Sequence, residues 1–196
     1  MTFSDVLPLA TYCFVMSSTP GPNNVMLATS AANFGYRSSV PQILGSQVGV
    51  AAQTGLTCLG LGGVFVMFPV LHEVLRVLGA LYLVFLAVRL SGLSMGEARV
   101  AQPLTFAQAA LFQAVNPKSW VKAVTLATVF MPTELNVALG ALLVATVGLV
   151  VGLPTMSVWA GFGLMIRHFL NRPLYRRLFN LTMGATLVAL AVSFLR

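Results

Sequence analysis

Two short polar runs interrupt otherwise apolar stretches of the chain, and each contains proline. The first run is Ser17-Ser18-Thr19-Pro20-Gly21-Pro22-Asn23-Asn24, and the second is Gln113-Ala114-Val115-Asn116-Pro117-Lys118. Proline lacks a backbone N–H, and its ring clashes with the carbonyl group four residues earlier, so a helix is expected to break at each run. The carbonyl groups freed at a break need new donors, because apolar surroundings supply none. Hydroxyls of Ser17, Ser18 and Thr19, amides of Asn23 and Asn24, water or a ligand are the candidate donors for the first break.

These runs predict a pocket for a carboxylate. If a helix restarts after each proline, its free N–H groups and the positive end of its dipole face the break. Two such helix ends that meet form a polar pocket, to which Lys118 adds a positive charge. Simpler interpretations stay open: the first run as a structural kink, and Lys118 as a side chain that extends to the membrane interface. For Lys122, one turn further on, the second interpretation is favoured.

The composition places these runs in a membrane protein. The 196 residues are 58% hydrophobic and only 8% charged, with a mean hydropathy of +0.90. A soluble domain usually needs about a quarter of its residues charged to cover its surface. The net charge of +7 comes mostly from short breaks between apolar runs, so it indicates membrane orientation and not nucleic-acid binding. Cys13 and Cys58 lie in apolar stretches with no metal-ligand spacing around them.

Six segments are long and apolar enough to cross a bilayer, which needs roughly 20 residues of helix. They are Val6–Leu27, Val40–Met67, Val70–Leu90, Phe106–Phe130, Ala138–Ile166 and Leu178–Leu195. The first connection contains the break Asn33-Phe34-Gly35-Tyr36-Arg37, and the fifth is a loop from Arg167 to Arg177. Lys and Arg gather in the first, third and fifth connections: Arg37, then Arg89 and Arg99, then Arg167, Arg172, Arg176 and Arg177. The positive-inside rule makes these connections cytoplasmic and puts both termini in the periplasm, although Arg76 and Arg196 oppose it.

The two halves of the chain resemble each other. Pro22 corresponds to Pro117 and Gly45 to Gly140, and after an insertion Gly79-Ala80-Leu81 corresponds to Gly184-Ala185-Thr186. Three spans in each half is an odd number, so the two halves enter the membrane from opposite sides. We therefore expect one all-α transmembrane domain, 1–196, built from two inverted three-helix repeats, about 1–90 and 106–196, joined by a cytoplasmic connection, about 91–105.

Other residues of the spans favour packing or remain open. Gly45 and Gly49, like Gly148 and Gly152, are four residues apart and are interpreted as helix contacts. Gln47 and Gln53 either line a cavity or hydrogen-bond between helices. The acids are Asp5, Glu73, Glu97 and Glu134, all near predicted span ends, so none is placed as a mid-membrane proton relay. Asp5 is the best remaining candidate for that role.

The run Thr19 to Asn24, together with Gly45, Gly49 and Asn116-Pro117-Lys118, resembles the LysE/RhtB family of bacterial amino-acid exporters. The resemblance covers essentially the whole chain. The Asn23-Asn24 pair and the run Asn116 to Trp120 are most similar to the branch that exports small neutral amino acids such as cysteine, O-acetylserine, threonine or homoserine. The resemblance implies efflux driven by the proton-motive force, with protons as the coupling ion.

The expectation is therefore an alternating-access exporter of small amino acids in the bacterial inner membrane, in contact with lipids and possible as a homo-oligomer. We expect the protein to have no cofactor, no metal and no enzymatic activity. The alternative function is that of a passive channel or facilitator. The residues expected to bind substrate are Pro20, Gly21, Pro22, Asn23, Asn24, Gln47, Asn116, Pro117 and Lys118. Tyr82 and Trp120 are expected to shape the pocket with Gln47.

Overall fold

The computed structural model describes residues 3–61, 67, 69–91 and 102–195. Every regular element in these ranges is a helix, which confirms the all-α class. The helices are α1 (Phe3–Ser18), α2 (Pro22–Phe34), α3 (Tyr36–Leu56), the π-helical turn η1 (Thr57–Leu61), α5 (Pro69–Ser91), α6 (Phe106–Val115), α7 (Pro117–Val129), α8 (Val137–Arg167), the 3₁₀ turn η2 (His168–Asn171) and α9 (Pro173–Leu195).

The predicted helix breaks are confirmed. The first predicted span divides into α1 and α2 around Thr19–Gly21, and the fourth divides into α6 and α7 at Asn116. The third and fifth predicted spans match α5 and α8 to within one residue at each end. The end of the second predicted span, and residues 92–101 of the predicted cytoplasmic connection, lie outside the described residues.

Two connections are shorter than the sequence predicts. The predicted break at Asn33–Arg37 is a single residue, Gly35, between α2 and α3. Gly35 has φ 90°, a conformation that side chains with a Cβ rarely adopt, and it turns the chain within one residue. The predicted loop from Arg167 to Arg177 is also mostly helical, since α9 already begins at Pro173, which suits the first position of a helix.

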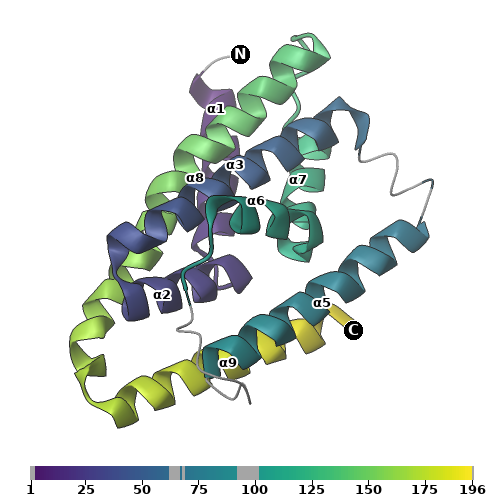
Figure 1. The fold of residues 1–196 in the computed structure, drawn as a ribbon. Coiled ribbons are helices and arrows are strands. Elements are labelled where there is room, and N and C mark those ends of the chain that lie inside the picture. Colours follow the sequence, from purple (N-terminus) through teal and green to yellow (C-terminus); the bar gives the residue numbers. More distant parts are fainter. Residues whose placement is uncertain (1–2, 62–66, 68, 92–101, 196) are drawn as a thin grey trace.

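The helices form two groups that Figure 1 shows clearly. Helices α5 and α9 lie side by side as an antiparallel pair beneath the other helices. Helix α8 runs the length of the molecule and packs against α1, α2 and α3. Three apolar clusters hold the groups together. One joins α5 and α9 to α2 and α6 around Leu83 and Phe112, a second joins α2, α3 and α8 around Ile43, and a third joins α1, α7 and α8 around Leu9.

Glycines let the short helix α6 lie directly against α3. A Cβ at Gly45 would collide with the carbonyl oxygen of Phe106, and one at Gly49 would lie 2.7 Å from the carbonyl oxygen of Ala110. Gly152 on α8 similarly leaves room for the amide of Gln47. These contacts confirm the packing interpretation for Gly45, Gly49 and Gly152. Gly148 has only an ordinary contact, 3.9 Å from the Cys13 sulfur.

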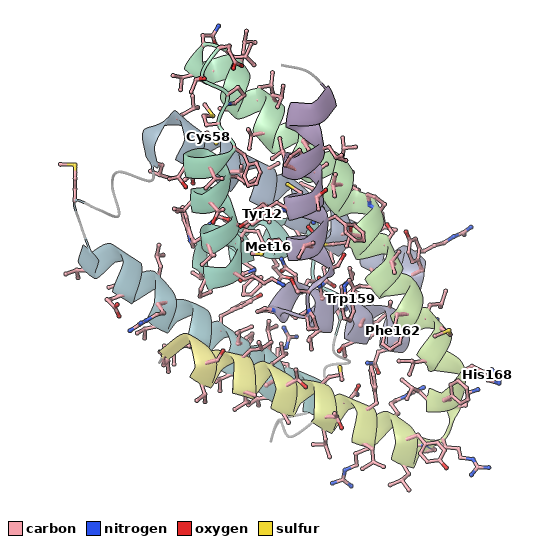
Figure 2. The ribbon with its side chains drawn as sticks, turned by 180° about the vertical axis from the view of Figure 1, so that it is seen from behind. Tyr12, Met16, Cys58, Trp159, Phe162 and His168 are labelled. Carbon is pink, nitrogen blue, oxygen red and sulfur yellow. The ribbon has the colours of Figure 1, made fainter. Side chains whose placement is uncertain are left out.

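Many large apolar side chains face outward. Leu81 on α5, Leu111 on α6 and Val158 on α8 are 61%, 73% and 71% exposed. Figure 2 shows the molecule from behind with its side chains as sticks, many of which extend outward from α5, α8 and α9. Apolar surface of this extent is what a lipid-facing protein presents.

One described helical stretch, Val137–Asn171, is by itself long and apolar enough to cross a membrane. Helices such as Val6–Ser18 and Phe106–Val115 are apolar but shorter, because each belongs to a span that proline divides. Whether the chain crosses the membrane six times stays a prediction.

Candidate functional site at the two helix breaks

The two helix breaks lie together, because side chains from each break bond to the other. Helix α2 begins with Pro22 after an extended Gly21, and α7 begins with Pro117 after Asn116. The two prolines are 95 residues apart (117 − 22), the same offset that relates the halves of the sequence. Proline at the first helical position is favourable, since its missing N–H has no partner there in any helix.

The carbonyl groups freed at the first break have donors from both halves. The side-chain amide of Asn24 donates to the carbonyl oxygens of Ser17 and Thr19, each at 2.9 Å. The ammonium of Lys118 donates to the carbonyl oxygens of Thr19 at 2.6 Å and Pro20 at 3.3 Å, and to the Thr19 hydroxyl at 3.1 Å. Lys118, which follows the second break, therefore stabilises the first break, and its side chain is not extended toward the membrane interface.

A second link joins the breaks in the opposite direction. Asn23 on α2 and Gln113 on α6 exchange two amide hydrogen bonds, Nδ2 to Oε1 at 3.0 Å and Nε2 to Oδ1 at 3.2 Å. Asn116 also donates to the same Gln113 oxygen, at 3.2 Å. Gln113 and Asn116 are nearly fully buried, so these amides have little access to water. Buried amide networks of this kind fix a single geometry.

The second break satisfies its own backbone groups. The Asn116 side chain accepts from the Lys118 backbone N–H at 3.2 Å and so caps α7. The Ser119 hydroxyl donates to the carbonyl oxygens of Gln113 at 3.0 Å and Asn116 at 2.8 Å. An N-cap asparagine typically contributes about 1 kcal/mol to helix stability.

A small cavity of about 40 Å³ lies where the breaks meet, and we call it the break cavity. Seven of the nine residues predicted to bind substrate line it: Gly21, Pro22, Asn23, Asn24, Gln47, Asn116 and Lys118. Pro20 and Pro117 do not line it, although the Pro20 carbonyl group contacts Lys118. The volume has room for water only, at roughly 30 Å³ per molecule.

Lys122 differs from its favoured interpretation as a side chain that extends to the interface. It is only 6% exposed, lines the break cavity and donates to the Ser17 hydroxyl at 3.2 Å. Burial follows from the pitch of α7: Lys122 lies four residues after Lys118, so both point from the same face toward the end of α1. The break cavity thus has two cationic side chains.

Gln47 is buried on α3, and its Oε1 atom has no hydrogen-bond partner among the described residues. A buried acceptor without a donor is unusual and indicates a place where a donor binds. The Oε1 atom of Gln53 also has no partner among the described residues, but its Nε2 atom donates to the Gln113 carbonyl oxygen at 3.2 Å and so links α3 to α6. The expectation that Gln47 lines a cavity is confirmed.

Two predicted pocket residues lie elsewhere. Tyr82 packs against Phe112, with ring centroids 5.2 Å apart, in the cluster between α5 and α6. Trp120 donates to the Ala114 carbonyl oxygen at 2.8 Å on the outer side of the second break. Neither lines the break cavity, so this expectation is wrong. An aromatic residue near a polar run carries no information about which face of its helix is turned inward.

The prediction omitted Gln113, Ser17, Ser119 and Lys122, which bond at or line the site. Gln113 belongs to the same polar run as Asn116, and this proximity was the available signal. Ser119 follows Lys118 at the third position of α7, where a hydroxyl reaches back over the break. For Lys122 no signal in the sequence distinguishes a buried side chain from one at the interface.

The break cavity has no carboxylate among its described lining residues. Glu73 pairs with Arg76 on α5, and Glu134 is exposed in the loop before α8. Glu97 and the side chain of Asp5 lie outside the described residues. Within the described part of the chain no group of His, Cys, Asp and Glu is arranged to hold a metal ion. The site is therefore cationic and suits an anionic group.

An all-helical chain with two proline-broken helices that meet at a cationic polar cavity has the form expected of a membrane translocator. Residues 14–196 match the family described as LysE type translocator, and the chain belongs to this family. The resemblance inferred from the sequence is thus confirmed.

The curated relatives carry a more specific name. The chain is 27% identical over 184 residues to cysteine/O-acetylserine efflux proteins of Escherichia coli O9:H4 (strain HS), Escherichia coli (strain K12) and Shigella flexneri serotype 5b (strain 8401). The matched part covers 93% of this chain and 93% of each relative. No solved structure is significantly similar to the chain.

Proposed function

We propose that the chain is a secondary transporter that exports small amino acids or their derivatives across the bacterial inner membrane by alternating access. The observation that carries the proposal is the break cavity, where both broken helices direct their N-termini and two lysines at one buried point. Membership of the LysE family and the names of the relatives support an amino-acid exporter. Cysteine and O-acetylserine are the first substrates to test.

The substrate carboxylate binds Lys118 and the helix N-termini in this mechanism. Lys118 bonds the carbonyl oxygens of Thr19 and Pro20 when the site is empty, and a carboxylate replaces these weaker acceptors. The ammonium group binds Gln47 Oε1, which lacks a donor, and Asn23. Because the break cavity has room for water only, the break must widen to admit substrate.

The widening links binding to alternating access. A substrate that takes Lys118 from the first break frees the end of α1, so α1 and α2 change their angle with respect to α7. We also propose that the chain consists of two inverted repeats of three spans. The inward-open and outward-open forms then differ in which repeat adopts which of two conformations. Protons are the proposed coupling ion, with both termini in the periplasm.

A passive facilitator is the second candidate. It is favoured by one observation, the lack of a carboxylate among the described residues that line the break cavity. A facilitator needs no proton-binding group, whereas proton-driven carriers usually use an acidic side chain within the membrane.

Efflux from preloaded vesicles distinguishes the candidates. Vesicles contain radiolabelled O-acetyl-L-serine, and efflux is measured with and without an imposed pH gradient. Asn23→Ala removes both amide hydrogen bonds between the first break and Gln113, and we expect its initial rate to fall by about tenfold or more. Asn171→Ala, which removes an exposed amide far from the cavity, is the control and keeps the wild-type rate.

Each result has a defined meaning. Gradient-accelerated efflux that Asn23→Ala loses supports a proton-coupled carrier with its site at the breaks. Efflux that ignores the gradient supports the facilitator. Equal rates for wild type and Asn23→Ala rule out the proposed site, and no efflux across a panel of small amino acids rules out the substrate class.

A further inference from the structure

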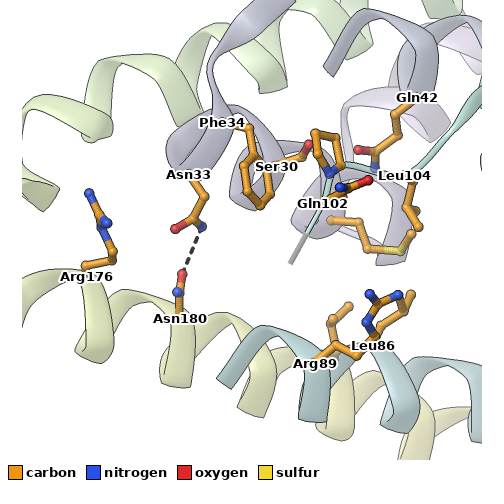
Figure 3. Close-up of a pocket in the computed structure, with 13 residues that line it drawn as sticks. Ser30, Asn33, Phe34, Gln42, Leu86, Arg89, Gln102, Leu104, Arg176 and Asn180 are labelled. Carbon is orange, nitrogen blue, oxygen red and sulfur yellow. Dashed lines mark hydrogen bonds between the residues drawn. The ribbon is translucent and has the colours of Figure 1, made fainter. Parts of the chain in front are cut away.

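A cavity larger than the break cavity lies away from the helix breaks. It has a volume of about 370 Å³, which falls within the range of small-molecule sites, and separates α2 and α3 from the pair α5 and α9. We call it the arginine cavity. Its polar lining residues are Ser30, Asn33, Gln42, Arg89, Gln102, Arg176 and Asn180, and Figure 3 shows them around the opening.

The charges of the arginine cavity suit an anion. Arg89 on α5 and Arg176 on α9 both line it, and none of its described lining residues is acidic. A guanidinium group can hold a carboxylate through two parallel hydrogen bonds. Both arginines belong to the connections that the sequence predicts to be cytoplasmic. In the predicted topology, the two arginines place the cavity on the cytoplasmic side, from which an exporter takes its substrate.

A buried acceptor faces the same cavity. Gln42 is only 2% exposed, and its Oε1 atom has no hydrogen-bond partner among the described residues. Figure 3 shows its side chain extending from α3 toward the other lining residues. A buried amide oxygen without a donor is costly, and an ammonium group would satisfy it.

The wall between α2 and α9 is closed by a specific bond. Asn33 Nδ2 donates to Asn180 Oδ1 at 3.0 Å, drawn as a dashed line in Figure 3. Asn33 also donates to the carbonyl oxygen of Thr29 at 2.9 Å, which fixes its orientation. The arginine cavity is thus a built pocket with ordered polar walls, and apolar side chains such as Met26 and Leu86 complete it.

One face of α2 connects the arginine cavity to the break cavity. Asn23 lines the break cavity, and Met26, Ser30 and Asn33 line the arginine cavity. These four positions follow the spacing i, i+3, i+7 and i+10, which places them along one side of a helix. On α3 the order along the chain is reversed, since Gln42 lines the arginine cavity and the later Gln47 lines the break cavity.

We propose that the arginine cavity is a second amino-acid site, where a zwitterion loads before it moves along α2 to the break cavity. The carboxylate binds Arg89 or Arg176, and the ammonium binds Gln42 Oε1. The inference rests on the proposed function and adds to it the place of first binding. A phosphatidylethanolamine headgroup has the same pairing of an anion with an ammonium that donates hydrogen bonds, which the quaternary ammonium of phosphatidylcholine cannot do, so the test must separate amino acid from lipid.

The test uses efflux of radiolabelled O-acetyl-L-serine at a series of internal concentrations. Gln42→Leu removes the acceptor and keeps most of the side-chain volume, and Arg89→Gln removes one cation. For each variant we expect the half-saturating internal concentration to rise by about fivefold or more, with the maximal rate within about twofold of wild type. Arg172→Gln removes an exposed charge from the same end of the molecule without touching the cavity, and its half-saturation stays at the wild-type value.

The same measurement is repeated in vesicles of phosphatidylcholine alone and of phosphatidylcholine with phosphatidylethanolamine. An equal rise in half-saturation in both lipids supports an amino-acid site. A rise that needs phosphatidylethanolamine assigns the cavity to lipid and overturns the inference.

Other results separate this inference from the proposed function. Unchanged half-saturation in both variants, with normal wild-type efflux, overturns the loading site alone. Absence of wild-type efflux overturns the proposed substrate class instead. Folding is checked by monodisperse size exclusion of each variant, and Arg89→Gln alone carries the test if Gln42→Leu proves unstable.

Discussion

In both helix breaks, the third residue of the following helix bonds the carbonyl groups freed at the break, but the N-cap residues of the two helices differ. Asn24 and Ser119 are each the third residue of their helix, and each reaches back to two carbonyl oxygens freed at its own break. The N-cap residues differ. Asn116 caps α7 with its side chain, whereas Gly21 gives α2 no side-chain cap.

The glycine makes the first break dependent on the second. A Cβ at Gly21 would lie 2.9 Å from the Lys118 side chain, so glycine leaves the space through which Lys118 reaches Thr19 and Pro20. The second break needs no such help for its backbone. The comparison teaches that the backbone of the first break depends on a cation from the other half of the chain, and is therefore the part of the site that a substrate can release.

The largest effect is expected for Lys118→Met. It removes the charged donor of the first break and the proposed carboxylate ligand, and hydrogen bonds to charged groups contribute about 1.5–3 kcal/mol. Efflux from vesicles should fall by about tenfold to hundredfold. Lys122→Met is the matched variant, because Lys122 bonds only the Ser17 hydroxyl, and its loss of efflux should be smaller.

Comparison of the efflux rates of Lys118→Met and Lys122→Met tests whether the substrate displaces Lys118 from the first break. If Lys122→Met impairs efflux more than Lys118→Met at equal amounts of folded protein, the substrate does not compete for the carbonyl groups of the first break. The amount of folded protein is measured by size exclusion before the efflux assay.

A smaller and different effect is expected on stability. Asn24→Ala removes both of its bonds across a break of three residues, and leaving buried groups unsatisfied costs about 1–3 kcal/mol. Ser119→Ala acts on a break of one residue that Asn116 still caps, so about 0.5–1.5 kcal/mol is expected. Thermal denaturation in detergent should therefore show a lower midpoint for Asn24→Ala. The reverse order would mean that the second break is the weaker one.

The breaks were predictable because proline acts locally. The missing N–H of Pro22 and Pro117 ends the preceding helix whatever surrounds it, so the sequence located both breaks correctly. Long apolar helices such as α5 and α8 were equally predictable from hydropathy. The extension of α2 to Phe34 was not, because one glycine with positive φ suffices for a turn that the sequence interpretation spread over five residues.

The partners of polar side chains were less predictable, because they depend on how distant helices pack. Asn23 was expected to serve the backbone of its own break, yet it pairs with Gln113 from the other half. Lys122 has the same sequence neighbourhood whether it is buried or at the interface. The arginine cavity gave no signal at all, since its lining residues are scattered over α2, α3, α5 and α9.

The smallest effect, and the sharpest test of the comparison, is expected for Gly21→Ala. Gly21 has an extended backbone that alanine also adopts, so only the contact with Lys118 opposes the new methyl group. The lysine is flexible and shifts, at a cost of about 0.5–1.5 kcal/mol for an unfavourable rotamer, which corresponds to a loss of efflux of about twofold to tenfold.

In the Lys118→Met background the same substitution should cost much less, because the ammonium no longer has to reach the carbonyl groups beyond position 21. A double-mutant cycle of initial efflux rates measures this coupling. Additive losses would mean that the missing cap, and not the space it leaves for the cation, is what distinguishes the first break from the second.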